Sequence, residues 1–125
     1  MRSSIVKTLD DKDLEFAEML QKLGIQQNVA TMITYLMNVE EATSRQIELG
    51  TDLRQPEVSI GAKILRYNGW LEESELKKDG KGRPMRVYKL KASIDEIINH
   101  LEKERIKEAE HLMQSIQKLK QLAAS

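Results

Sequence analysis

The sequence contains no cysteine, few aromatic residues and no long apolar run. Without cysteine, the 125-residue chain has no disulfides, no thiolate metal ligands and no cysteine nucleophile. One Trp, one Phe and three Tyr predict a mostly aliphatic core. No stretch reaches the roughly 18 apolar residues of a membrane span, and the first residues lack the apolar segment of a signal peptide. We therefore expect a soluble, cytoplasmic protein without a membrane partner.

The formal net charge is zero, but the charges are unevenly distributed. Residues 1–53 carry five Lys/Arg and nine Asp/Glu, whereas residues 54–91 carry ten and five and residues 92–125 carry five and six. The middle segment therefore has a net charge of +5. A basic segment in an otherwise acidic chain favours contact with nucleic acid. An ordinary mixed-charge surface is the alternative interpretation.

The first half of the chain predicts two amphipathic helices. Asp10 or Asp11 is suited to cap a helix that ends near Leu23, and Gly24 supplies the stop. Its apolar stripe, predicted to be core or dimer interface, comprises Phe16, Met19, Leu20 and Leu23. The second helix is expected over residues 26–38, with a core face of Val29, Met32, Ile33, Leu36 and Met37.

The next segment predicts a helix-turn-helix. After a connector at residues 40–42, Thr43 and Gln46 form a capping-box pattern, which predicts a short helix over 44–49 with Ile47 and Leu49 buried. Residues 50–52 form the turn and Leu53 enters the core. A longer helix begins at Arg54 or Gln55, with Pro56 in its first turn, and ends at Asn68 before Gly69.

A β-hairpin and a long helix complete the chain. Residues 70–77 and 85–91 predict two strands, joined by a basic loop in which Asp79-Gly80 and Gly82 are turn signals. From Ser93, with Glu96 as its capping partner, the pattern is helical to the end. A helix of about 29 residues spans roughly 43 Å, too long to pack entirely on a 90-residue domain.

The distal half of this helix has a seam with the alternating spacing of a coiled coil, although the repeat is irregular near Arg105. A second copy of the chain is the simplest partner for it. We therefore predict a DNA-binding domain over residues 1–91, including the N-terminal helix, and a dimerisation helix over 92–125. The predicted dimer-interface residues are Leu101, Ala109, Leu112, Ile116 and Leu119.

These motifs resemble the winged helix-turn-helix transcriptional regulators, of the MarR-like, ArsR-like and small archaeal kind. The residues that carry the resemblance are Gln55-Pro56-Glu57-Val58-Ser59, Leu65, Gly69-Trp70-Leu71, Gly82-Arg83-Pro84 and Val87-Tyr88. The resemblance implies a mainly α fold with a small antiparallel hairpin (α+β) and a long C-terminal dimerisation helix. It also implies a homodimer that binds double-stranded DNA, with residues 54–68 in the major groove and the wing at 77–86 on the backbone or minor groove.

Carried onto this sequence, the resemblance places Val58, Ala62, Leu65 and Trp70 in the core. The predicted DNA contacts are Arg54, Gln55, Glu57, Ser59, Lys63, Arg66, Lys77, Lys78, Lys81, Arg83 and Arg86. Helix residues with amide or basic side chains are suited to base edges, whereas the wing cations are suited to phosphates, with Arg83 the candidate for the minor groove. Glu57 either accepts a hydrogen bond from cytosine or favours the helix N-terminus.

Two positions depart from the pattern of these regulators. Ile60 and Ile64 stand where polar or basic residues are usual. They are expected to pack against the N- or C-terminal helix, with contact to thymine methyl groups as the alternative. Arg54 occupies a position where a Ser or Thr cap is usual, so the cap remains open.

His100 and His111 lie about three helical turns apart on one face, a spacing similar to the interfacial zinc site of metal-sensing ArsR-like proteins. The other two ligand positions are Ile98 and Gln114, so half the ligands are missing. No metal or other cofactor is expected.

The sequence also lacks a nucleophile–base set and a phosphate-binding glycine loop, which argues against an enzyme. The alternative function is a winged-helix protein-interaction module without DNA binding. Whether an effector binds stays open.

Overall fold

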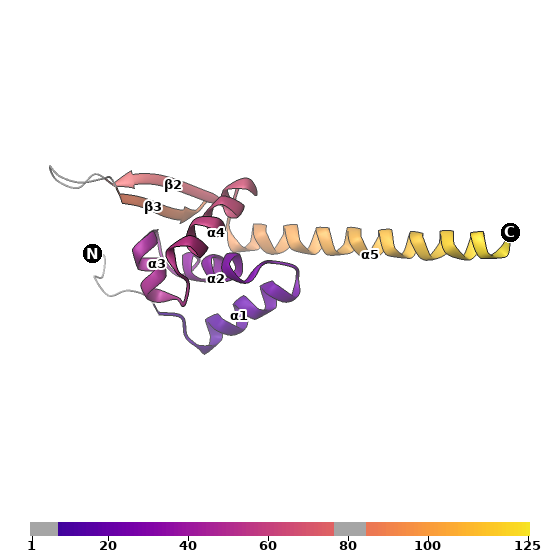
Figure 1. The fold of residues 1–125 in the computed structure, drawn as a ribbon, viewed down its shortest axis with the longest axis horizontal. Helices are drawn as coiled ribbons and strands as arrows, with labels where there is room; N and C mark the ends of the chain where they lie inside the picture. The colour runs from indigo at the N-terminus through magenta and orange to yellow at the C-terminus, as the bar shows by residue number, and fades with distance from the viewer. Residues whose placement is uncertain (1–7, 77–84) are drawn as a thin grey trace. The chain divides into compact units, whose positions relative to one another are not determined.

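The computed structural model describes residues 8–76 and 85–125. These residues divide into two compact units, with the boundary between Ser93 and Ile94. The first unit contains four helices and a small sheet, and the second is a single helix (Figure 1). The elements are α1 (Asp11–Lys22), α2 (Gln27–Leu36), β1 (Ala42–Thr43), α3 (Ser44–Gly50), α4 (Gln55–Tyr67), β2 (Leu71–Leu76), β3 (Met85–Leu90) and α5 (Ile94–Ala124). The predicted fold class, mainly α with a small antiparallel sheet in a winged helix-turn-helix arrangement, is confirmed.

Helix α1 begins and ends where its capping residues require. Asp13 N–H donates to Asp10 Oδ1 at 2.8 Å, and Asp10 N–H donates to Asp13 Oδ2 at 3.0 Å, a reciprocal capping box. At the other end Gly24 has a φ of 99°, and the N–H groups of Gly24 and Ile25 donate to the carbonyls of Gln21 and Leu20. This Schellman motif explains the predicted stop, because a left-handed residue there favours glycine.

Of the apolar stripe predicted for α1 as core or dimer interface, only part lies in the core of the single chain, and its role in a dimer stays a prediction. The buried side of the helix consists of Asp13, Ala17 and Leu20, whereas Met19 is 51% exposed. Asp13 is accommodated by hydrogen bonding, since Asn38 Nδ2 donates to its Oδ1 at 3.1 Å and so joins α1 to the segment after α2. The buried side of α1 therefore combines the small residue Ala17 and the hydrogen-bonded Asp13 with Leu20.

Helix α2 lies at the centre of the first unit and contacts α1, α3, α4 and β3. The sequence predicts one apolar face, but the helix is buried nearly all round: its buried residues are Val29, Ala30, Met32, Ile33, Thr34, Tyr35 and Leu36. The Thr34 hydroxyl donates to the Ala30 carbonyl at 2.8 Å. Burial raises the pKa of the Tyr35 phenol above its ordinary value, because the anion would be poorly solvated.

The predicted helix-turn-helix is confirmed at α3 and α4. The Thr43–Gln46 capping box opens α3, with Gln46 N–H donating to Thr43 Oγ1 at 3.1 Å and Thr43 N–H to Gln46 Oε1 at 2.9 Å. Ile47 is fully buried, but Leu49 is 55% exposed, so its predicted burial is wrong. In the turn, Leu53 is buried and its N–H donates to Thr51 Oγ1 at 3.1 Å.

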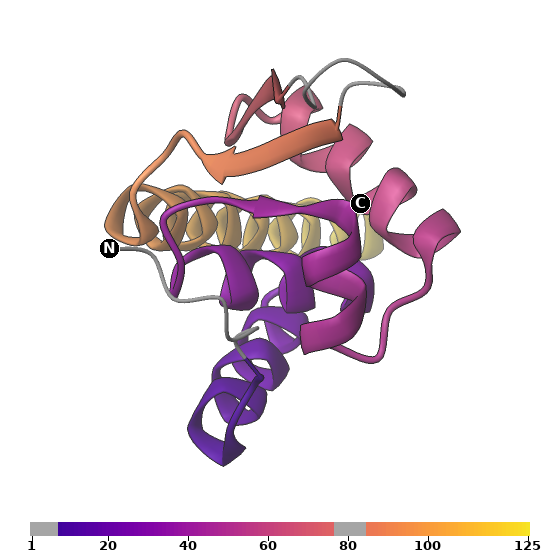
Figure 2. The ribbon, with the colours of Figure 1, turned by 90° about the vertical axis from the view of Figure 1, so that its left-hand side faces the viewer.

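The three strands form an antiparallel sheet in the order β1-β3-β2, with β3 between the other two (Figure 2). The pairing Leu71↔Leu90 through Leu76↔Met85 forms the predicted hairpin. β1 adds Ala42↔Tyr88 and Thr43↔Val87 on the other edge of β3. α4 packs against β2 as well as against α2 and α3.

The second unit, α5, has 31 residues and therefore extends about 46 Å at 1.5 Å per residue. Figure 1 shows it as one continuous helix. Its buried residues, Ile97 and Leu101, both lie in the first three turns. From Ile106 onward the large apolar residues are exposed.

Candidate nucleic-acid interface

Helix α4 is seated closely on α2. Gly61 lies on the buried side of α4, and a Cβ built there would stand 2.4 Å from Met32 Sδ. Because Met32 is itself fully buried, a larger residue at position 61 would force a shift. Asn28 Nδ2 also donates to the Glu57 carbonyl at 3.1 Å, which ties the first turn of α4 to α2. Together these contacts fix the orientation of α4 in the first unit.

Both ends of α4 have defined caps. The Arg54 N–H donates to Glu57 Oε1 at 3.0 Å, which is the half of a capping box in which the side chain at N3 accepts from the N-cap backbone. Arg54 is therefore the N-cap residue, and its side chain accepts no hydrogen bond from the helix. At the other end Gly69 has a φ of 77°, and Trp70 N–H donates to the Leu65 carbonyl at 2.9 Å in a Schellman motif. The chain then enters β2.

The outward face of α4 contributes nothing to the core. The buried residues Val58, Gly61, Ala62 and Leu65 occupy one side. At about 100° of rotation per residue, the side directly opposite carries Pro56, Ile60, Lys63 and Tyr67, and all four residues are exposed. We call these four residues the α4 outer face. Gln55, Ser59 and Arg66 lie along one flank of it.

Two residues of the α4 outer face are large and apolar or aromatic. Ile60 is 55% exposed and Tyr67 is 91% exposed. The exposure of Ile60 contradicts the expectation that it packs against another helix, whereas Ile64 is half-buried. Tyr67 is absent from the predicted contact residues. The same helical arithmetic that identifies the buried side would have found it, because it lies one turn beyond Lys63.

The predicted contact residues within α4 are exposed without exception. They comprise Arg54 at the cap and Gln55, Glu57, Ser59, Lys63 and Arg66 in the helix. Their roles differ, however. The Glu57 carboxylate accepts from the Arg54 N–H at the start of the helix, which favours the second of its two predicted roles. Lys63 lies in the middle of the α4 outer face.

Glu73 connects α4 with the hairpin through two arginines. Its carboxylate forms an ion pair with Arg66 of α4, and Arg86 Nη1 of β3 lies 3.8 Å from its other oxygen. The Glu73 side chain is 20% exposed, and those of Arg66 and Arg86 are 47% and 64% exposed. Two predicted DNA-contacting cations therefore share one carboxylate, which reduces the positive charge that they present. Sequence reasoning missed Glu73, because it lies on β2, outside the predicted contacts.

The remaining predicted wing contacts lie outside the described residues: Lys77, Lys78, Lys81 and Arg83. Arg86 is the wing cation that the structure places, and it stands at the second position of β3. β2 and β3 are paired up to Leu76 and Met85, the described residues on either side of this segment.

The predicted dimer-interface residues on α5 do not share one environment. Leu101 is only 4% exposed in the single chain, so it offers little area to a second copy. Ala109 is exposed, and Leu112, Ile116 and Leu119 are 63%, 44% and 67% exposed. With spacings of three, four and three residues, these four lie along one side of the helix. We call them the α5 stripe.

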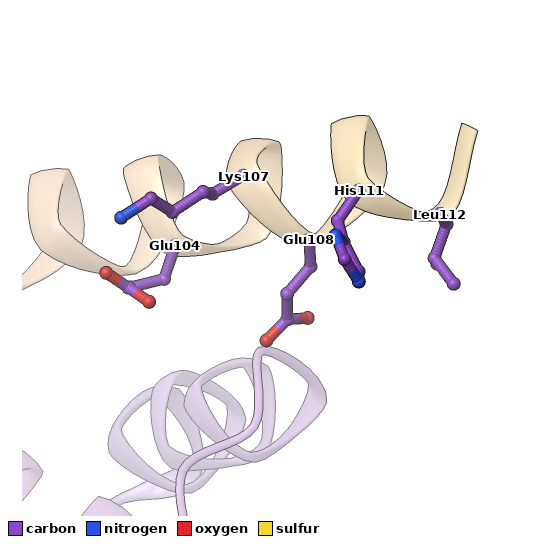
Figure 3. Close-up of a pocket in the computed structure, with 5 residues that line it drawn as sticks. All are labelled: Glu104, Lys107, Glu108, His111 and Leu112. Atoms are coloured by element: carbon purple, nitrogen blue, oxygen red, sulfur yellow. The ribbon is translucent and has the colours of Figure 1, made fainter. Parts of the chain in front are cut away.

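A shallow hollow beside α5 is lined by Glu104, Lys107, Glu108, His111 and Leu112. Figure 3 shows the side chains of Glu104, Glu108, His111 and Leu112 projecting from the same side of the helix. In residues 8–76 and 85–125, no three His, Asp or Glu side chains are grouped so as to hold a metal ion. Across the same ranges, the helices are too short or too polar to traverse a bilayer.

Comparison with known proteins finds a similar fold. No protein-family model and no curated protein sequence matches the chain. Among solved structures, the chain is similar to a protein of Methanosarcina mazei Go1 described as a possible transcriptional regulator, with a TM-score of 0.62 and 18% sequence identity. The likeness covers 91% of this chain and 98% of the other. The chain therefore shares nearly the whole fold of that protein.

Proposed function

We propose that the protein is a transcriptional regulator that binds double-stranded DNA sequence-specifically as a homodimer. The observation that carries this proposal is the α4 outer face, which is exposed, contains Lys63 and serves no structural purpose in the first unit. A helix-turn-helix presents its second helix to the major groove. The net charge of +5 over residues 54–91 matches the sign that a phosphate backbone requires.

The α5 stripe supports the homodimer. Three of its residues are large, apolar and at least 44% exposed, and a soluble helix rarely leaves a continuous apolar stripe uncovered. A second α5 offers a stripe with the same spacing, so two copies can pack with coiled-coil geometry. The two α4 helices of the dimer would then read half-sites about one helical turn of DNA apart.

Lys63→Gln tests the placement of α4 on DNA. Loss of a lysine that contacts a base or phosphate is expected to weaken binding by about 1–3 kcal/mol, or roughly 5- to 150-fold. Fluorescence anisotropy with duplex selected from random DNA, repeated at several salt concentrations, measures both affinity and its salt dependence. The matched control is Lys12→Gln on α1, which removes the same charge from an exposed site outside the interface.

Affinity that is independent of salt, or equal weakening in both lysine variants, would exclude this DNA-binding mode. A protein-interaction module is the second candidate function, and the exposure of Ile60 and Tyr67 is the observation that favours it. The same titration separates the two functions, because apolar protein contacts lack the steep salt dependence of phosphate binding. Under the second function the wing substitutions Lys81→Ala and Arg83→Ala should leave partner binding intact.

Glu73→Gln is expected to tighten DNA binding and steepen its salt dependence. The substitution removes the carboxylate that engages Arg66 and Arg86, so both guanidiniums become available to phosphates. Each further phosphate neutralised adds about 0.9 to the slope of log affinity against log salt. Glu72→Gln is the matched control, since it removes the same charge from an exposed residue on the opposite face of β2. Weaker binding by Glu73→Gln would instead mean that the carboxylate positions the arginines for DNA.

A further inference from the structure

Ile60 is an exposed apolar residue on a face otherwise suited to polar contacts. Its neighbours on the α4 outer face are Lys63 and Tyr67, and Ser59 and Arg66 flank it. At 55% exposure it is half in solvent, while the buried side of α4 is complete without it. The fold therefore gives no reason for isoleucine at this position. A ligand that contacts α4 would supply one.

The floor of the DNA major groove offers an apolar group of suitable size. The C5-methyl group of thymine projects there, whereas the other groups that distinguish the bases are hydrogen-bond donors and acceptors. Isoleucine is well suited to contact such a methyl group, because in a helix its χ1 angle is almost fixed. Its two Cγ atoms are consequently held in one place before binding, and little χ1 entropy is lost on contact.

Lys63 lies at a suitable distance from Ile60 for the two to act on neighbouring base pairs. The two residues are separated by three positions, or about 4.5 Å along the helix axis, which is close to the 3.4 Å spacing of bases along a strand. Tyr67 lies one further turn along the same face and is 91% exposed. Its phenolic hydroxyl is suited to donate to a phosphate, a contact that orients the helix without reading sequence.

We infer that Ile60 is a specificity-determining residue that recognises the methyl group of one thymine in each half-site, with Lys63 contacting the adjacent base pair. This inference rests on the proposed function, since it names what the α4 outer face reads. An apolar contact with the thymine methyl group then selects one base of the half-site. Lys63 and the flanking polar residues supply the hydrogen bonds around it.

Deoxyuridine substitution tests the inference directly, because deoxyuridine lacks the methyl group of thymine and keeps its hydrogen-bonding edge. A half-site is first selected from random DNA, and each of its thymines is then replaced in turn. Replacing the thymine read by Ile60 is expected to lower affinity about fourfold per half-site, the effect of leaving one methyl group unburied. Anisotropy titrations at fixed salt measure the change.

The protein variants are Ile60→Ala and, as the matched control on the same face, Tyr67→Phe. Ile60→Ala is expected to bind the thymine and deoxyuridine duplexes equally, and to bind the thymine duplex about as weakly as the wild type binds the deoxyuridine duplex. Tyr67→Phe should retain the fourfold difference. Because both residues are exposed, circular dichroism and thermal melting should show both variants folded.

Three results would overturn the inference while leaving DNA binding in place: a selected half-site without thymine, no sensitivity to deoxyuridine at any position, or undiminished sensitivity in Ile60→Ala. A failure of the proposed function looks different. In that case the wild-type protein would bind no duplex at low salt, and the α4 outer face would have no DNA to read.

Discussion

Replacing Leu112 and Ile116 together with glutamate is expected to convert the proposed dimer into a monomer. Both side chains are exposed in the single chain, and each stabilises the pairing of two α5 helices by about 1.5–3 kcal/mol when buried. A buried, unpaired carboxylate at the same position would add a further penalty. Sedimentation equilibrium of the free protein measures the change in mass.

The same double substitution is expected to weaken binding to DNA that carries two half-sites by about 10²- to 10⁴-fold, because the second α4 no longer binds as part of one molecule. Binding to a single half-site should change little. Gln114→Glu with Gln117→Glu is the matched control, since it adds the same two charges to α5 on positions away from the α5 stripe. A dimer that survives the Leu112 and Ile116 changes would place the dimer interface elsewhere.

Leu65→Ala is expected to lower the free energy of unfolding by about 2–5 kcal/mol, because it removes a fully buried side chain from the contact of α4 with the core. Such a loss is a large fraction of the stability of a small domain. Urea denaturation at one fixed protein concentration measures it, since the proposed dimerisation would make apparent stability depend on concentration.

Ile60→Ala is the control for this experiment, since it shortens a branched aliphatic side chain on the opposite side of the same helix. We expect a change within about 0.5 kcal/mol, because Ile60 is exposed and alanine favours the helix. Equal destabilisation by the two substitutions would contradict the orientation of α4. Together the two variants distinguish the buried side of α4, which stabilises the fold, from its exposed side, which does not.

Capping residues made much of the fold predictable from sequence. The pairs Asp10–Asp13 and Thr43–Gln46, and the glycines at positions 24 and 69, specify hydrogen bonds that depend on near neighbours in the chain. Such local signals place helix ends without knowledge of the tertiary structure. The core face of α4 was equally predictable, because a helix of 13 residues repeats its period often enough to define one side.

Burial was less predictable in short or central helices. α3 has seven residues, so its two turns define a buried side poorly, and Leu49 proved exposed where Ile47 is buried. α2 is covered by four other elements, and a periodicity argument cannot anticipate how wide a face those elements cover. In α1 the polar residue Asp13 is buried through its hydrogen bonds, a tertiary effect that composition does not reveal.

The exposed residues of the candidate site were predictable from the sequence, but the ion pairs that reduce its positive charge were not. Exposure of the predicted α4 contact residues followed from helical period. The position of Glu73 between Arg66 and Arg86 did not, because it depends on the pairing of β2 with β3 and on the packing of α4 beside β2. Counting charges along residues 54–91 treats each cation as equally available to a phosphate. The ion pairs with Glu73 make Arg66 and Arg86 less available than the others.

Under the proposed function, the separation of the two sides of α4 has a consequence for how DNA preference can change over time. Val58, Ala62 and Leu65 hold the helix in place, whereas Ile60, Lys63 and Tyr67 contribute little to stability. Substitutions at the latter three positions therefore leave the free energy of unfolding high enough for the protein to fold, whereas most mutations in a core lower it too far. If the protein binds DNA as proposed, new operators become accessible by single substitutions at these positions, and the same freedom makes α4 a practical starting point for redesigning the selected sequence.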